Sequence, residues 1–338
     1  MKESKKQATW APQGRVLITG ATGVIGSWVA AGLVNRGIRP VLLDQRADYS
    51  LLGSLKDNVD LVVGDILDWP TLTRVMLKEK VEVVIHLAVL MIPAAQANPY
   101  QAFQVNAQGS INVFEAARAA GSHRVVWVSS RSVFGQFDGE FGHPTYRPVD
   151  EYHPRQPRTV YGATKLAVEA MAEQYRRIYG QDIIGLRFPA IYGPGRLQRH
   201  GAISLTSRII ESGLAGRRLS LPDGGDQKDD QLYVKDAAEA LVASAAAPGP
   251  TPEPVYNLGT GHPVGLRDFA AAVKAVAPGA DITIGPGLDY VKMGYTEYAV
   301  LDGTRAARDL GFVPRFDLPG GVRDYAESLR ALGLKPLG

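Results

Sequence analysis

A glycine-rich string, TGATGVIG, runs from residue 19 to residue 26, directly after a short apolar segment and directly before a helical pattern. Within it, Gly20, Gly23 and Gly26 recur at every third position. In a strand–turn–helix unit the first glycine allows a tight turn, the second lets the backbone approach a pyrophosphate, and the third lets the helix pack closely on the sheet. The start of that helix adds N–H donors and the positive end of its dipole. The string therefore predicts a dinucleotide-binding turn rather than a glycine turn without a ligand.

An aspartate, Asp44, ends the next β-like run, roughly 20 residues after the glycine string, where such turns carry a ribose-binding acid. A carboxylate there can accept hydrogen bonds from the adenosine ribose and would repel a 2′-phosphate. We therefore expect NAD rather than NADP. Arg46 is close enough to soften this preference without reversing it.

Short apolar runs rich in β-branched residues alternate with helical stretches up to residue 188. These runs cover residues 15–19, 40–44, 60–65, 81–88, 124–130 and 182–188. Such runs are typical of parallel strands covered on both faces, and their alternation with helices is typical of doubly wound sheets. We predict an α/β fold, with a Rossmann-type doubly wound parallel sheet and a smaller C-terminal substrate-binding lobe.

The local composition of the sequence changes beyond Pro189, where glycine, proline and basic residues cluster. We predict a disordered tail over residues 1–14, an NAD-binding Rossmann domain over 15–190, and a substrate-binding lobe built mainly from 191–338. A renewed strand–helix pattern indicates that the chain returns to the first domain at about residues 231–262. The seam between two such parts is a usual place for a ligand.

The composition narrows the function further. The chain has 338 residues and no cysteine, so disulfides, thiolate metal sites and cysteine nucleophiles are excluded. With a net charge of +3, no basic stripe and no long apolar run, we expect neither a nucleic-acid partner nor a membrane partner. The histidines lack metal-ligand spacing, so we expect no metal, and His86 is expected to serve packing. These features predict a soluble cytoplasmic protein.

Tyr161 and Lys165 stand four positions apart in VYGATKLAVEA, at the start of a helical pattern. Four residues make about one helical turn, so both side chains project from one face. A lysine ammonium beside a phenol lowers the tyrosine pKa from its ordinary value of about 10. Such a phenol can take a proton from an alcohol. The alternative is a surface tyrosine beside a solvated lysine.

Taken in order, these motifs resemble those of the extended short-chain dehydrogenase/reductases, within the NAD-dependent epimerase/dehydratase family. The likeness covers nearly the whole chain after residue 14, and GDILD, HLA, VNAQG and SSRSVFG extend it. The resemblance implies NAD as the cofactor. It implies cofactor contacts at Gly20, Gly23, Val24, Ile25, Gly26, Asp44, Asp65, Ile66, Leu87, Ala88, Asn106, Tyr161, Lys165 and Pro189.

The same resemblance implies a catalytic triad of Ser130, Tyr161 and Lys165. Ser130 would hydrogen-bond the substrate oxygen, Tyr161 would exchange the hydroxyl proton, and Lys165 would lower the tyrosine pKa while holding the nicotinamide ribose. Hydride transfer itself belongs to the cofactor. The alternative for Ser130 is a serine that ends a strand and satisfies the backbone.

Several positions depart from the family pattern. Arg131 and Ser132 follow the triad serine where dehydratases of the family carry acidic residues, so elimination of water is not expected. Asp229 stands where nucleotide-sugar members usually carry an arginine for the diphosphate, and an aspartate there would repel it. This weakens the interpretation as a nucleotide-sugar enzyme without removing it.

Some segments, QPRTVYGATK and LRFPAIYG among them, resemble the short-chain type of L-threonine 3-dehydrogenase. Ile92 replaces the serine with which those enzymes usually touch the amino acid, and the apolar Leu90–Ile92 stretch either shapes the substrate site or serves packing. Arg196, Arg199 and His200 form either an anion-binding group or a solvated basic loop, and we favour the loop. The candidate substrate residues are Met91, Ile92, Arg131, Ser132, Arg196 and Arg199.

Our main prediction is an NAD-dependent oxidoreductase that interconverts a secondary alcohol and a ketone on a small polar substrate, a hydroxy acid or a sugar derivative. The alternative is a nucleotide-sugar epimerase with tightly bound, recycled NAD, and a third possibility is a non-catalytic NAD-sensing protein. We also expect a homodimer formed through the helices near 98–120 and 159–179 of each subunit. The predicted small-residue faces are Ala102, Ala116 and Ala120 on one helix and Ala163, Ala167 and Ala170 on the other.

Overall fold

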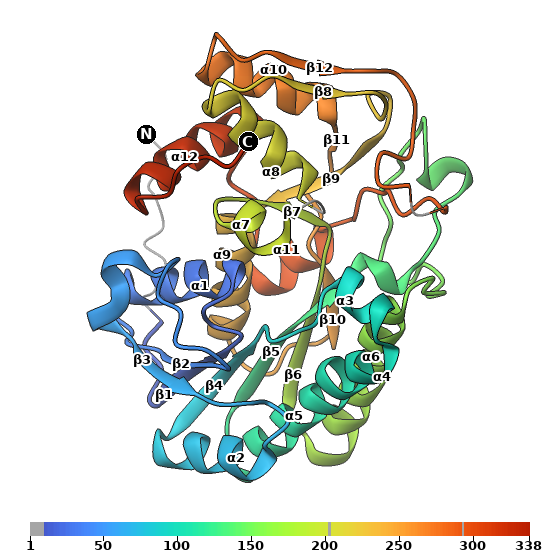
Figure 1. The fold of residues 1–338 in the computed structure, drawn as a ribbon. Coiled ribbons are helices and arrows are strands. Elements are labelled where there is room, and N and C mark those ends of the chain that lie inside the picture. The colour runs from blue at the N-terminus through green and yellow to red at the C-terminus, as the bar shows by residue number, and fades with distance from the viewer. Residues whose placement is uncertain (1–9, 202–203, 293) are drawn as a thin grey trace, which may run out of the picture.

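The computed structural model describes residues 10–201, 204–292 and 294–338. A seven-stranded sheet of the order β10-β6-β5-β4-β1-β2-β3 forms its centre, and each pair of neighbouring strands is parallel (Figure 1). Its strands are β1 (Arg15–Thr19), β2 (Val41–Asp44), β3 (Asp60–Val63), β4 (Val81–His86), β5 (Arg124–Ser130), β6 (Asp182–Phe188) and β10 (Val255–Asn257). The predicted α/β fold with a doubly wound parallel sheet is confirmed.

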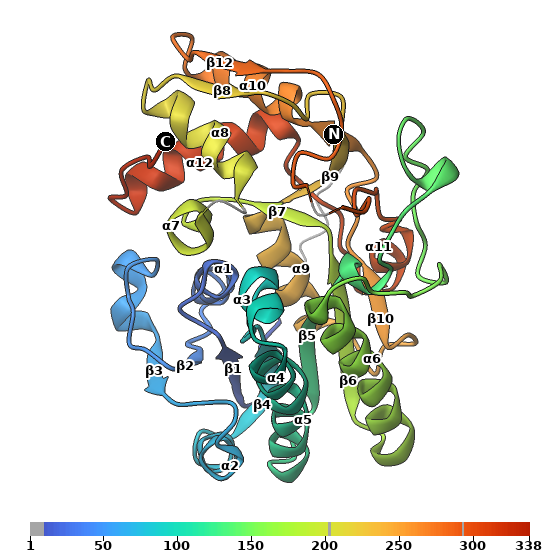
Figure 2. The same ribbon diagram turned by 45° about the vertical axis from the view of Figure 1, so that its right-hand side comes forward.

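The sheet is buried on both faces because apolar side chains alternate across it. In β1, Val16 and Ile18 enter one hydrophobic cluster, whereas Leu17 between them enters the cluster on the opposite face. Helices on both sides complete these clusters (Figure 2). One face carries α1 (Val24–Val34) and α9 (Val234–Ala246), and the other carries α2 (Trp69–Lys78), α5 (Gly109–Ala119) and α6 (Val160–Tyr179).

Two of the predicted strands end earlier than expected. β3 stops at Val63 rather than at residue 65, and β4 stops at His86 rather than at residue 88. The residues just beyond these ends turn into the edge of the sheet, where they line a cavity instead of pairing with a neighbouring strand.

Above the carboxyl ends of these strands lies a region built mainly from later parts of the chain (Figure 1). It contains a three-stranded sheet of order β11-β9-β7 and a two-stranded sheet of order β12-β8. Its strands are β7 (Ala190–Tyr192), β8 (Leu219–Leu221), β9 (Lys228–Tyr233), β11 (Pro263–Gly265) and β12 (Ile282–Ile284). Its helices are α7 (Arg196–His200), α8 (Leu205–Leu214), α10 (Leu266–Val276) and α12 (Leu318–Ala331). The remaining helix of this part of the chain, α11 (Thr304–Leu310), contacts α9 and β10 instead.

The chain returns to the main sheet through α9 and β10, which lie within the predicted return segment. The exact division of the chain into domains stays a prediction. Residues 1–9 of the predicted disordered tail lie outside the described residues. From Trp10 onward the tail contacts the folded body, since Trp10 packs against the main hydrophobic cluster and the Gly14 N–H donates to Glu82 Oε2 at 2.6 Å.

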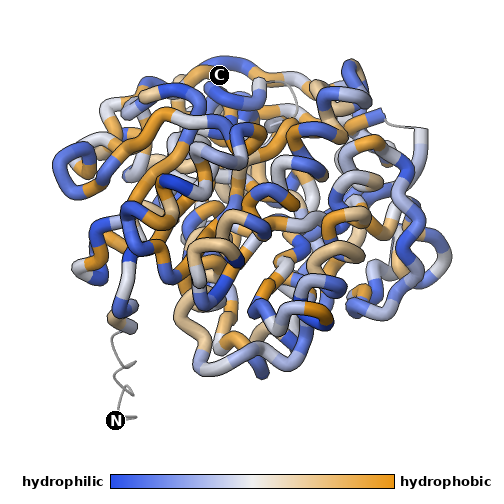
Figure 3. Tube along the Cα trace, turned by 90° about the horizontal axis from the view of Figure 1, so that it is seen from below, coloured by the Kyte–Doolittle hydropathy of each residue, from blue (hydrophilic) through white to orange (hydrophobic). Residues whose placement is uncertain are grey.

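Short elements complete the fold. They are η1 (Gly53–Asn58), α3 (Ile92–Ala97), α4 (Pro99–Ala102), the π-helical η2 (Phe103–Gln108), η3 (Arg131–Val133) and η4 (Gly139–Phe141). The predicted helix near 98–120 is divided into two of them, α4 and η2, followed by α5. Seen from below, hydrophobic stretches gather toward the middle of the molecule and hydrophilic ones toward its periphery (Figure 3). Among the described helices, none combines the length and the apolar character that crossing a membrane requires.

Candidate active site

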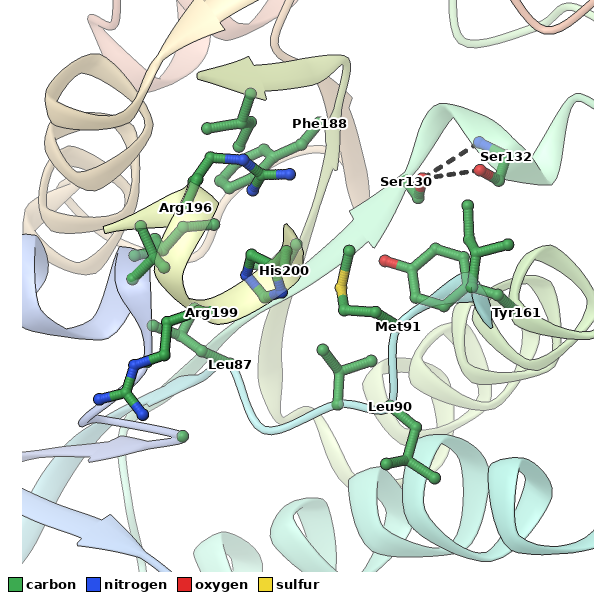
Figure 4. A pocket seen from close by; sticks show the side chains of 18 of the residues that line it. Leu87, Leu90, Met91, Ser130, Ser132, Tyr161, Phe188, Arg196, Arg199 and His200 are labelled. Atoms are coloured by element: carbon green, nitrogen blue, oxygen red, sulfur yellow. Dashed lines mark hydrogen bonds between the residues drawn. The ribbon is translucent and has the colours of Figure 1, made fainter. Parts of the chain in front are cut away.

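A cavity of about 890 Å³ lies at the carboxyl ends of the main strands, the edge at which open α/β sheets bind ligands (Figure 4). Most of the residues that we predicted for the site line it. They are Gly20, Gly23, Val24, Ile25, Gly26, Asp44, Asp65, Ile66, Leu87, Ala88, Met91, Ile92, Ser130, Arg131, Ser132, Tyr161, Pro189, Arg196 and Arg199. Lys165 and Asn106 stand behind this wall, and each hydrogen-bonds the backbone of a residue that lines it. The individual roles of these residues stay predictions.

The glycine turn fits a dinucleotide because, at Gly20 and Gly26, no side chain could be added without displacing the backbone. Gly20 has φ +64°, and a β-carbon there would lie 2.6 Å from the Ala88 nitrogen. A β-carbon at Gly26 would lie 2.6 Å from the Gly20 oxygen, so α1 could not approach the turn as it does. The turn carries no side chains at these positions, so a pyrophosphate can approach its backbone and the N-terminus of α1.

Asp44, at the carboxyl end of β2, is held in place by the same turn. Its Oδ2 accepts hydrogen bonds from the Thr22 N–H at 3.0 Å and from the Thr22 hydroxyl at 2.8 Å. Both bonds go to one oxygen, so within the described part of the chain Oδ1 is left to accept from a ribose hydroxyl. This arrangement fits NAD, as the sequence predicted.

Tyr161 and Lys165 come from the first turns of α6, which begins where the Thr159 hydroxyl accepts from the Gly162 N–H at 2.9 Å. The Tyr161 hydroxyl points into the cavity (Figure 4). Lys165 is 4% exposed, its Nζ donates to the Val128 oxygen at 2.6 Å, and it lies 5.6 Å from the centre of the Tyr161 ring. The two side chains share one helix face, and the alternative of a surface pair is wrong.

The expected lowering of the tyrosine pKa is not found in this structure. Burial raises the pKa of Tyr161 to about 12, although a hydrogen bond with Ser130 acts in the opposite direction. Burial also lowers the pKa of Lys165 to about 7, because an ammonium loses its hydration there. Desolvation is therefore the largest influence on the pKa of both groups.

Ser130 ends β5 and begins η3, so both interpretations of this serine have structural support. Its Oγ accepts from the Ser132 N–H at 3.2 Å, which is a backbone-capping contact. The same hydroxyl donates to Ser132 Oγ at 3.2 Å and lies on the cavity wall beside Tyr161.

Asn106 lies in the π-helical turn η2 and fixes the loop after β4. Its Oδ1 accepts from the Leu90 N–H at 2.7 Å, and its Nδ2 donates to the Leu90 oxygen at 3.0 Å. π-Helical turns frequently occur at functional sites. Asn106 thereby holds the wall of Leu90, Met91 and Ile92 rather than facing the cavity. Ile92 also packs in the cluster around Tyr161, so this stretch serves both packing and the site.

Asp229 does not present an uncompensated charge to the site. Arg131 forms a bidentate ion pair with it. Its Nη1 donates to Oδ1, and its Nη2 donates to Oδ2 at 2.8 Å. The two side chains are 12% and 2% exposed. Our argument that Asp229 would repel a diphosphate is therefore wrong, because its charge is balanced by the adjacent guanidinium.

Glu297 lines the cavity and was missed by the sequence analysis. Its Oε1 accepts a hydrogen bond from the Ser132 hydroxyl, across a separation of 165 residues. Tyr295 donates to Oε2 at 3.4 Å. No local motif marks this segment, which reaches the site only because the final third of the chain folds back over β5.

The basic residues of α7 are not a solvated loop, contrary to the interpretation that we favoured. Arg199 bonds Asp48 Oδ2 at 2.6 Å and Ser50 Oγ at 3.1 Å, so it bridges α7 to the segment after β2. Arg196 and His200 line the cavity (Figure 4). Burial lowers the pKa of His200 to about 4, so its imidazole is neutral at neutral pH.

His86 serves packing, as predicted. It is 3% exposed, with ring nitrogens 2.6 Å from Thr19 Oγ1 and 3.0 Å from Ser110 Oγ. Burial lowers its pKa to about 3. Within the part of the chain that the structure describes, no group of three or more histidine or acidic side chains is arranged to hold a metal ion.

Known proteins place this fold and this cavity in context. Residues 16–259 match the model of the NAD dependent epimerase/dehydratase family. The chain belongs to this family. A UDP-glucose 4-epimerase from Mycolicibacterium smegmatis is 30% identical to it, over 94% of this chain and 98% of that protein.

Solved structures of the family agree with this relationship. The UDP-glucose 4-epimerase of Thermus thermophilus in complex with NAD is 27% identical, with a TM-score of 0.77 over 94% of this chain and 99% of that chain. MoeE5 in complex with UDP-glucose and NAD is 28% identical, with a TM-score of 0.76 over the same shares of the two chains. This epimerase/dehydratase family member is an NAD-dependent enzyme, as the sequence predicted.

The main functional prediction is wrong. We expected an oxidoreductase that interconverts a secondary alcohol and a ketone on a small polar substrate, whereas the relatives from Mycolicibacterium smegmatis and Thermus thermophilus are UDP-glucose 4-epimerases. Two arguments led away from them. One was the resemblance of some segments to L-threonine 3-dehydrogenase, and the other was the charge of Asp229, which the structure pairs with Arg131.

Proposed function

We propose that this enzyme is a nucleotide-sugar epimerase that oxidises one hydroxyl-bearing carbon of the sugar and reduces it again from the other face. The near full-length match to a UDP-glucose 4-epimerase is the observation that carries the proposal. The balanced Arg131–Asp229 pair supports it, because no net negative charge at that position opposes a diphosphate. NAD would be retained between the two halves of the reaction.

In the proposed mechanism the phenolate of Tyr161 takes the proton of the sugar hydroxyl during oxidation, and the phenol returns it to the ketone oxygen during reduction. Because burial raises the pKa of Tyr161 to about 12, the positive charges of Lys165 and of oxidised NAD, when bound, would have to stabilise this phenolate. Ser130 donates a hydrogen bond to that oxygen, and Lys165 supports the phenolate and the nicotinamide ribose. NAD, when bound, supplies the hydride acceptor and donor. Glycines 20, 23 and 26 would hold its pyrophosphate and Asp44 its adenosine ribose.

Epimerisation also requires the ketone intermediate to rotate within the site, so that its other face meets the cofactor. The wall formed by Leu90, Met91 and Ile92 is apolar and half-buried, so its side chains offer no hydrogen bonds that would hold one face of a sugar ring. The size of the cavity, about 890 Å³, is compatible with a ligand that turns there beside a cofactor.

The direct test is incubation of the purified protein with UDP-glucose or UDP-glucuronate, without added NAD. We expect each accepted substrate to reach an equilibrium mixture of its two 4-epimers, measured by ion-exchange chromatography, with no net NADH. Failure to convert either compound, or accumulation of NADH in proportion to product, would contradict the proposal.

We further propose that Arg199 slows the release of NAD by bridging α7 to the segment after β2. Both partners are about one-third exposed, at 31% and 33%, so the pair contributes modestly. Replacing Arg199 by alanine is expected to increase the rate of NAD release by up to about fivefold. This factor corresponds to the free energy of about 1 kcal/mol that an exposed ion pair contributes at most. The release rate is measured by trapping free NAD with an auxiliary dehydrogenase. Arg208→Ala, an exposed position on α8 outside the cavity, is the control and should release NAD like the parent protein.

A homodimer through α6 remains part of the proposal, with a changed interface. Ala163, Ala167 and Ala170 are exposed on α6, near the exposed apolar side chains of Met171 and Ile178. The alanine face predicted on the other helix is wrong, since Ala102 and Ala116 are fully buried within the subunit. There the exposed large apolar side chains are Tyr100 and Phe103, at 74% and 57%. Apolar patches of this kind favour a protein interface.

Ala167→Arg is expected to convert such a dimer to monomers, because it places a long charged side chain in an apolar interface. Sedimentation velocity at micromolar concentration measures the change. The same substitution at exposed Ala271, on α10, is the control and should leave the mass unchanged. A parent protein that sediments as a monomer would overturn the dimer. The cytoplasmic location stays a prediction.

A further inference from the structure

Three arginines line the cavity, and their surroundings differ in one respect. Arg131 is paired with Asp229, and Arg199 is paired with Asp48. Arg196 has no carboxylate and no hydrogen-bond acceptor for its side chain among the described residues, and its Nε is buried without a partner. In Figure 4 its guanidinium extends into the cavity beside Phe188, on the side opposite Tyr161.

An unpaired guanidinium in such a place is energetically unfavourable. Burial lowers the pKa of Arg196 to about 10, which still leaves it charged at neutral pH. Desolvating a charge without a partner costs free energy that a bound anion would offset. Guanidinium groups bind phosphate and carboxylate particularly well, because two parallel N–H groups match two oxygens.

The opposite wall of the cavity is arranged differently. Glu297 accepts from the Ser132 hydroxyl, and Asp229 is neutralised by Arg131. Neither carboxylate bonds Arg196. The cavity therefore has an uncompensated cation on one side and hydrogen-bond acceptors near Ser130 on the other, an arrangement that suits a substrate with hydroxyl groups at one end and an anion at the other.

We propose that Arg196 binds the anionic group of the substrate, and so performs in this enzyme the task that Asp229 cannot perform. The inference rests on the proposed function, because it places the anion on a nucleotide sugar. The shared chemistry is a phosphate or carboxylate oxygen pair, which belongs either to the diphosphate or to an acid group on the sugar.

The test measures the binding of UDP, UDP-glucose and UDP-glucuronate to the NAD-loaded protein by calorimetry. Arg196→Leu is expected to weaken binding by about 10- to 100-fold, the effect typical of losing charge-assisted hydrogen bonds. If Arg196 holds the diphosphate, all three ligands weaken equally. If it holds a sugar acid, only UDP-glucuronate weakens. Equal binding of all three ligands to the parent and to Arg196→Leu overturns the inference.

Two further variants separate binding from folding. Arg196→Lys keeps the positive charge but lacks the paired N–H donors of the guanidinium, so it should bind the nucleotides with intermediate affinity. Arg208→Leu, which removes the same charge from an exposed position on α8 outside the cavity, should leave nucleotide affinity unchanged. Arg196→Leu should unfold at a temperature equal to or higher than the parent protein, because it removes an uncompensated buried charge.

The proposed function and this inference can fail separately. If the parent protein binds none of the three nucleotides, the proposed function fails. Arg196 is then tested with inorganic pyrophosphate as the probe. Binding to the parent that is lost in Arg196→Leu upholds the anion site, and absent or equal binding overturns it.

Discussion

Replacing Tyr161 by phenylalanine is expected to lower the rate of epimerisation by about 10²- to 10⁴-fold, the contribution typical of a positioned general acid–base. The substitution removes only the hydroxyl that points into the cavity and keeps the ring that packs against Ala95 and Ala102. NAD content, measured after acid release, should therefore stay at the level of the parent protein. Turnover is measured by chromatography of the two epimers.

The matched control for this experiment is Tyr175→Phe, on the same helix. Tyr175 lies outside the cavity and donates to Glu115 Oε1 at 2.7 Å, so its hydroxyl has a structural partner rather than a catalytic place. It should change stability by about 1 kcal/mol, as for an ordinary hydrogen bond, without lowering turnover. A Tyr161→Phe protein that epimerises at the parent rate would remove Tyr161 from the mechanism.

Replacing Asp229 by asparagine is expected to destabilise the protein by about 3–5 kcal/mol, the cost of leaving one partner of a buried ion pair uncompensated. Arg131 would remain charged beside β9, because a guanidinium stays protonated in proteins. It would also lose the carboxylate that offsets the effect of burial on its charge. Urea unfolding of the parent and the variant gives the difference in the free energy of unfolding.

The structure offers a close control for that measurement. Asp226 pairs with Arg267 at 2.7 Å, but these side chains are 42% and 49% exposed. Asp226→Asn should therefore cost only about 0–1 kcal/mol. The double variant Arg131→Met/Asp229→Leu should recover stability relative to Asp229→Asn, since neither charge remains. Equal, small effects of Asp229→Asn and Asp226→Asn would show that the Arg131–Asp229 pair is not buried as described.

The sequence was sufficient for the fold and for most residues around the cavity, for one physical reason. In a parallel sheet the carboxyl ends of all strands meet at one edge, so residues that end or directly follow predicted strands, such as Asp44, Ser130 and Gly20, must approach one another. Helical spacing placed Tyr161 and Lys165 on one face in the same way.

What the sequence could not supply were contacts between loops and the effect of burial. Glu297 and Arg199 meet their partners, Ser132 and Asp48, across long stretches of chain that no period or motif connects. The effect of Asp229 was misjudged because the sequence does not show which cation lies beside it, and its partner Arg131 is distant along the chain. The pKa of Tyr161 was misjudged because it depends on desolvation, which depends on the whole packed site.

The position of β10 has a consequence for anyone who wishes to isolate the cofactor-binding part of this enzyme. β10 pairs with β6 at one end of the main sheet, and α9, just before it, covers the hydrophobic face that also packs against α1. A fragment that stops at residue 190 lacks both elements. It would leave β6 as an unpaired edge strand and expose apolar residues of β4 and β5, which are features that promote aggregation. Although the residues predicted to contact the cofactor are concentrated in the first half of the chain, we expect the unit that can fold around them to extend at least to Asn257.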